Sequence, residues 1–121
     1  MPIKPLLSGA ALILAAAFST GARAHAKLEV AEPKAGSTVS PSPKEIRLQF
    51  NETLEAPFSK IKLADAHDAV IEPSAVAVDK DNPRLLVASM PALPAGAYRV
   101  QWSAMTRDGH KVKGEYAFNV K

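Results

Sequence analysis

The stretch Tyr98-Arg99-Val100-Gln101-Trp102-Ser103 alternates large apolar side chains with polar ones, and this period of two decides the fold class. Successive side chains of a β-strand point to opposite faces, so such a segment buries one face and leaves the other in solvent. Similar short runs occur elsewhere and, with residues 98–103, predict about seven strands. The other runs are residues 27–30, 46–50, 60–63, 76–78, 85–87 and 116–120.

Turn-forming residues separate these runs, and no stretch beyond residue 24 has a helical stripe of ten residues. Pro91-Ala92-Leu93-Pro94-Ala95-Gly96 is a typical connection, because proline has no N–H to donate to a sheet. Short strands without helices to cover a parallel sheet predict an antiparallel β-sandwich or barrel. The length of 121 residues is that of a single domain.

Residues 1–24 have the features of a secretory signal peptide. Lys4 precedes an apolar run over residues 6–18, and Ala22-Arg23-Ala24 is a typical cleavage site. The apolar run is shorter than the roughly 20 residues that cross a bilayer. We therefore expect a cleaved signal at residues 1–24 and a domain at residues 25–121 that is exported and not embedded in the membrane.

Composition excludes some classes of function. The expected signal contains two of the fifteen basic residues, Lys4 and Arg23, and none of the twelve acidic ones, so the domain is nearly neutral. It shows no basic patch interleaved with aromatic residues, so we do not expect a nucleic-acid partner. The chain has no cysteine, so its folding cannot depend on disulfides.

Cleavage after Ala24 would make His25 the first residue. Its α-amine and its ring Nδ1 can then chelate one metal ion. The free amine has a pKa of about 7.7–8.0, so a metal can displace its proton near neutral pH. An amine and an imidazole in a planar arrangement suit Cu(II), which also heads the affinity order of the divalent metals.

The segment Asp108-Gly109-His110 offers two further ligands. In an extended segment, residues two apart project to one face, so Asp108 and His110 would complete an N₃O set with His25. Asp-Gly is equally a common hairpin turn signal, and the position of the cleavage site alone would also account for a histidine at residue 25. The residues alone leave both a metal site and a plain turn open.

On these residues the sequence is similar to the CopC family of periplasmic copper-resistance proteins, including its single-domain YobA-like members. The resemblance extends over the whole domain and implies a Greek-key β-sandwich of the immunoglobulin or cupredoxin type. The motifs that carry it are His25-Ala26-Lys27-Leu28, Glu32-Pro33, Gly36-Ser37, Leu48-Gln49-Phe50-Asn51-Glu52, Phe58-Ser59, Gly96-Ala97-Tyr98-Arg99-Val100-Gln101-Trp102, Asp108-Gly109-His110-Lys111-Val112-Lys113-Gly114 and Tyr116-Ala117-Phe118-Asn119-Val120.

The resemblance also implies the site and the function. It implies one Cu(II) per chain, bound by the amine and ring of His25 and by Asp108 and His110. Glu52 would either orient a ligand or a water molecule near the copper, or be a solvated loop carboxylate. The implied protein is a periplasmic monomer that is not an enzyme and sequesters or delivers copper. Its implied partners are the copper ion and a CopD-like inner-membrane protein.

One stretch departs from the family pattern. Several members have a second site, for Cu(I), on a methionine-rich loop, whereas the matching residues 63–70 here contain no methionine. Met90 and Met105 are expected to be packing residues, and the sequence therefore predicts a Cu(II)-only member. His67, within this stretch, is either a surface-loop histidine or a weak metal contact.

Two other classes of function stay open. A histidine that chelates copper through its terminal amine, a histidine brace, is also the centre of lytic polysaccharide monooxygenases, so a copper-dependent oxidase is one alternative. Here Asp108 is available to fill the coordination sphere, and most aromatic residues occupy strand positions rather than a flat binding face. The other alternative is a metal-free structural β-sandwich module.

Overall fold

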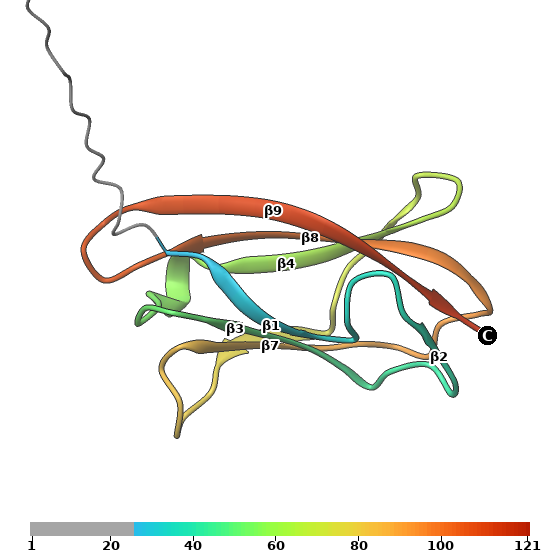
Figure 1. Cartoon of the computed structure of the whole chain (residues 1–121), viewed down its shortest axis with the longest axis horizontal. Coiled ribbons are helices and arrows are strands. Elements are labelled where there is room, and N and C mark those ends of the chain that lie inside the picture. The colour runs from blue at the N-terminus through green and yellow to red at the C-terminus, as the bar shows by residue number, and fades with distance from the viewer. Residues whose placement is uncertain (1–25) are drawn as a thin grey trace, which may run out of the picture.

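Nine β-strands and one 3₁₀ turn make up residues 26–121, the part of the chain that this computed structural model describes (Figure 1). The strands form two sheets packed face to face. The first sheet has the order β1 (Leu28–Glu32), β3 (Glu45–Phe50), β7 (Leu85–Ser89) and β6 (Ala75–Val78). The second has the order β2 (Thr38–Val39), β9 (Lys111–Val120), β8 (Gly96–Met105), β4 (Lys60–Asp65) and β5 (Val70–Ile71).

The predicted all-β sandwich is confirmed, and each of the seven predicted runs overlaps a strand. The structure adds β2 and β5, which have two residues each and are too short to show an alternating pattern. β2 also pairs with β9 in parallel, whereas the other strand pairs are antiparallel. The predicted signal peptide and its boundary lie outside the described residues.

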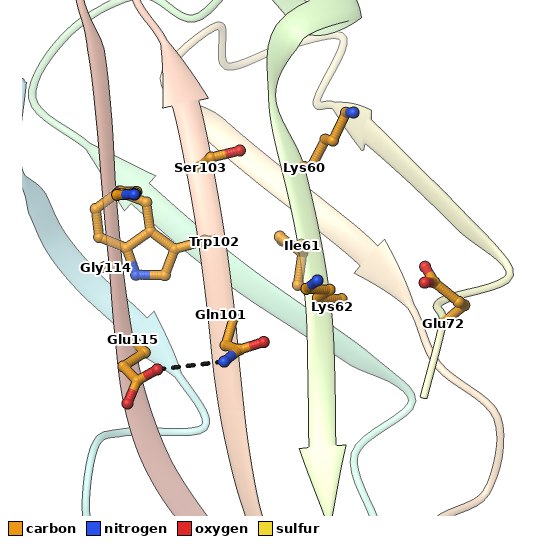
Figure 2. Close-up of a pocket in the computed structure, with 10 residues that line it drawn as sticks. Lys60, Ile61, Lys62, Glu72, Gln101, Trp102, Ser103, Gly114 and Glu115 are labelled. Carbon is orange, nitrogen blue, oxygen red and sulfur yellow. Dashed lines mark hydrogen bonds between the residues drawn. The ribbon is translucent and has the colours of Figure 1, made fainter. Parts of the chain in front are cut away.

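Alternate side chains of β8 point into the core between the two sheets. Tyr98, Val100 and Ala104 are buried, and the Trp102 ring meets the Phe50 ring edge-on, with centroids 5.1 Å apart. Trp102 lies opposite Gly114 of β9 (Figure 2), where a Cβ atom would come within 2.6 Å of the indole Cζ2. Glycine at position 114 therefore leaves room for the indole.

β8 and β9 form the longest hairpin of the described chain, with ten residue pairs from Gly96↔Val120 to Met105↔Lys111. Its turn lies at the end of the sandwich where β1 also begins (Figure 1). The hairpin thus brings the segment around Asp108 close to the start of the domain. Within residues 26–121, no helix is long and apolar enough to cross a membrane.

Candidate metal centre

The turn between β8 and β9 is closed by backbone hydrogen bonds. The N–H of Thr106 donates to the carbonyl of His110 at 2.9 Å, and the N–H of Gly109 donates to the carbonyl of Thr106 at 2.8 Å. Gly109 has a φ of 93°, in the region that only glycine adopts readily. The Asp-Gly pair therefore forms a hairpin turn, as its sequence indicates.

This turn also brings Asp108 and His110 together. Asp108 Oδ2 lies 3.0 Å from His110 Nδ1, and the N–H of His110 donates to Asp108 Oδ1 at 3.2 Å. The two side chains are 50% and 59% exposed. The segment is a tight turn rather than extended, so the two side chains meet by a different route from the predicted one.

Thr106 positions the Asp108 carboxylate. Thr106 is buried, and its hydroxyl donates to Asp108 Oδ1. This hydrogen bond and, next in size, the one from the His110 N–H lower the pKa of Asp108 below its ordinary value of 3.8. These contacts therefore favour the ionised form of Asp108, which is the form of a carboxylate that binds metals. Sequence reasoning did not single out Thr106; its position two residues before an aspartate in a turn was the available signal.

The loop that follows β3 joins this turn to the start of the described chain. On one side, the N–H of Lys27 donates to Asn51 Oδ1 at 2.8 Å, and the N–H of Asn51 donates to the Lys27 carbonyl at 3.2 Å. On the other side, the N–H of Arg107 donates to the Thr53 carbonyl at 3.0 Å. Residue 27 is thereby fixed near the turn, whereas the predicted ligand His25 lies outside the described residues.

Glu52 lies in the middle of this loop, between Asn51 and Thr53, and is partly buried. Within residues 26–121 its side chain makes no hydrogen bond or ion pair. No three His, Cys, Asp or Glu side chains of that range are grouped so that they could bind a metal. The structure thus brings together two of the predicted ligands, Asp108 and His110, and places Glu52 on the loop that contacts their turn.

A sequence model of the CopC domain matches residues 28–121. The chain belongs to the CopC family. It is 36% identical to copper resistance protein C of Escherichia coli over 98% of this chain and 96% of the relative. It is also 36% identical to protein YobA of Escherichia coli K12, over 81% of this chain and 80% of the relative.

Solved structures agree with this assignment. The crystal structure of CopC from Methylosinus trichosporium OB3b superposes with a TM-score of 0.75 at 32% identity, over 80% of this chain and 94% of that chain. Escherichia coli PcoC, described as a methionine-rich copper resistance protein, superposes with a TM-score of 0.70 at 36% identity, over 81% and 100%. The predicted CopC-type sandwich is confirmed.

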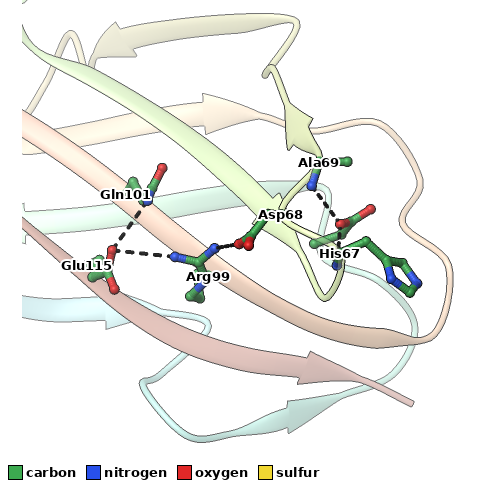
Figure 3. A network of polar contacts seen from close by, with 7 residues as sticks. His67, Asp68, Ala69, Arg99, Gln101 and Glu115 are labelled. Carbon is green, nitrogen blue, oxygen red and sulfur yellow. Dashed lines mark hydrogen bonds and ion pairs between the residues drawn. The ribbon is translucent and has the colours of Figure 1, made fainter.

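This CopC-family chain differs from the methionine-rich PcoC in its methionine content. Beyond residue 25 it has only Met90 and Met105, and Met90 packs against the core. His67 lies on the exposed turn between β4 and β5, where its N–H donates to Asp65 Oδ1 at 2.8 Å (Figure 3). β4 begins beside the end of β8, through the 3.2 Å bond from the Met105 N–H to Ser59 Oγ. His67 follows the opposite end of β4 and is therefore remote from the Asp108–His110 turn.

Proposed function

We propose that this CopC-family chain is a periplasmic copper-binding protein that holds Cu(II), sequesters or delivers it, and is not an enzyme. The observation that carries the proposal is the Asp108–His110 pair, positioned by the buried Thr106 at the end of the sandwich where the domain begins. The copper-resistance names of relatives that match nearly the whole chain support the choice of metal.

The proposed ligands are the amine and imidazole of His25, the Asp108 carboxylate and the His110 imidazole. Signal cleavage after Ala24 is part of this proposal, because it creates the amine. Metal bonds to nitrogen and oxygen are about 2.0 Å long, so two ligands at a right angle lie about 2.8–3.0 Å apart. The 3.0 Å separation of His110 Nδ1 and Asp108 Oδ2 is compatible with neighbouring positions in a tetragonal Cu(II) site.

Nitrogen and carboxylate donors favour Cu(II), whereas Cu(I) prefers the thioethers that residues 63–70 lack. We therefore propose one Cu(II) per monomer and weaker binding after reduction, which would release the metal. Glu52 would orient a ligand or a water molecule from the loop after β3, which contacts Lys27 on one side and Arg107 on the other. A CopD-like inner-membrane protein is the proposed recipient.

The central experiment adds one alanine before His25 in the exported protein. We expect mass spectrometry of the unaltered protein to give a chain that begins at His25 with one copper. The added alanine removes the amine chelate and should weaken Cu(II) binding at least a hundredfold in a competition titration. An alanine added after Lys121 is the matched control. Unchanged affinity in the first variant would show that the amine is not a ligand.

Two single histidine substitutions distinguish binding at the proposed site from non-specific Cu(II) binding. His110→Ala should remove most Cu(II) affinity, whereas His67→Ala, on the exposed β4–β5 turn, should leave it unchanged. Both variants lose one imidazole, so the comparison controls for non-specific binding by histidine. Equal losses in the two variants would contradict the proposed ligand set.

A further inference from the structure

The outer face of the second sheet carries a depression of about 880 Å³ (Figure 2). Strand register places polar side chains across it in two rows, Lys60–Ser103–Lys113 and Lys62–Gln101–Glu115. The neighbouring positions on β4 and β8 point into the core, since Ile61, Leu63 and Val100 are buried. Lys111, exposed on β9 and two residues before Lys113, lies between the first row and the Asp108–His110 turn.

Of the charged side chains that line the depression, Glu115 has an ion-pair partner within the described chain and the lysines have none. Glu115 accepts a hydrogen bond from Gln101 at 3.3 Å and lies 3.8 Å from Arg99, which also forms an ion pair with Asp68 (Figure 3). Within residues 26–121, by contrast, no ion pair involves a lysine. Glu72, the other carboxylate of the lining, has no ion pair within this range either, so the depression carries a net positive charge because its three lysines outnumber its two carboxylates.

The spacing of these lysines suits an extended chain. Residues two apart on one strand are about 7 Å apart, so Lys60 and Lys62 on β4, and Lys111 and Lys113 on β9, repeat at the spacing of alternate residues in a β-strand. The two lysine pairs flank β8 and lie about 10 Å apart. A strand lying along β8 would direct its side chains alternately toward the two pairs.

We propose that this lysine-lined depression binds an acidic segment of a partner polypeptide, extended along β8. Gln101 and Ser103 on the floor can form hydrogen bonds to the backbone of such a segment. The proposal goes beyond copper binding, because none of these groups is a proposed ligand. Since Lys111 follows His110 directly, the bound partner would lie beside the candidate metal centre.

The shape and charge pattern favour a polypeptide over other anions. A lipid surface is flat, whereas this surface is hollowed. Glu72 and Glu115 also line the depression, and a dense array of phosphates would meet both carboxylates. A polypeptide can place an uncharged or basic residue opposite each of them.

The test measures binding of fluorescein-labelled hexaglutamate to the metal-free exported protein by fluorescence anisotropy at low ionic strength, with hexaglutamine as the uncharged probe. Metal-free protein makes the result independent of the copper proposal. The test variant replaces three lysines of the depression by glutamine, and the matched control replaces three exposed lysines elsewhere, for the same change in net charge. The two sets are Lys60, Lys62 and Lys113, and Lys34, Lys44 and Lys121.

Hexaglutamate should bind and hexaglutamine should not. The depression variant should weaken binding about tenfold, because three exposed ion pairs that each contribute about a factor of two act together. The control variant should weaken binding less than twofold. Replacing the same three depression lysines by arginine should preserve binding, because arginine keeps the positive charge at each position.

Three results would overturn the proposal. They are absence of hexaglutamate binding at low salt, equal losses in the depression and control variants, and lysine-dependent binding to phosphatidylglycerol vesicles without binding of the peptide. The second result would mean attraction by net charge alone, and the third would assign the face to a membrane surface.

Discussion

Thr106→Val tests how the candidate metal centre is built. Thr106 is 1% exposed, and valine has nearly its shape, so the substitution removes the hydroxyl without opening a cavity. The lost group is the donor to Asp108 Oδ1, which makes the largest contribution to the low pKa of that carboxylate. The backbone N–H of His110 remains as a donor to the same oxygen.

The expected magnitude follows from these remaining contacts. Removing a partner that orients a metal ligand typically weakens metal binding 10- to 100-fold. Because Asp108 retains the His110 N–H and is half-exposed to water, we expect the lower end, about tenfold weaker Cu(II) binding. The free energy of unfolding of the metal-free protein should change by less than about 1 kcal/mol, since water can replace the lost donor.

The assay is a competition titration for Cu(II), with urea unfolding of the metal-free protein alongside it. Thr38→Val, on the exposed strand β2, is the matched control and should leave Cu(II) affinity unchanged. Wild-type affinity in Thr106→Val would refute the reasoning, because it would mean either that Asp108 is not a ligand or that Thr106 does not position it.

Three further predictions concern the fold. Gly114→Ala should destabilise the protein by about 1–3 kcal/mol in urea unfolding, because the new Cβ would lie 2.6 Å from Trp102; unchanged stability would mean that the indole moves freely. Tyr116→Phe should raise the free energy of unfolding by about 1 kcal/mol, since this buried hydroxyl has no partner within residues 26–121 and burial raises its pKa. A lower stability would reveal a missed partner. The pKa of Asp65 is held below 3.8 by the N–H groups of Ala69 and His67, so its stabilisation is present above that pH and is lost as the pH falls through the lowered pKa. Asp65→Asn should therefore lower the melting temperature at pH 7, and the difference from wild type should shrink below about pH 4.

The sequence predicted the larger strands because their alternation directly reflects burial. Tyr98 and Val100 are buried and Arg99 is not, as the pattern required. β2 and β5 could not be predicted, since two residues carry no period. β2 also pairs with β9, a strand distant in sequence. The parallel pairing of β2 with β9 likewise has no local signal.

The candidate site was predictable only in part, for a similar reason. The proximity of Asp108 and His110 was expected from their spacing, but that expectation assumed an extended segment, whereas the structure brings them together in a tight turn. Thr106 resembled any strand residue, because its burial and its bond to Asp108 appear only once the hairpin is folded. The loop at residues 51–55 makes backbone hydrogen bonds to Lys27 and Arg107, and neither bond has a sequence signature.

The two interpretations of Asp108-Gly109-His110, a plain turn and a pair of metal ligands, do not exclude each other. The positive φ of Gly109 allows the tight reversal, and that reversal brings Asp108 Oδ2 within 3.0 Å of His110 Nδ1. A longer loop would satisfy the hairpin equally well but would leave the two side chains free to separate. The same glycine that closes the hairpin therefore sets the spacing of these two side chains, so the fold alone holds the proposed ligand pair together.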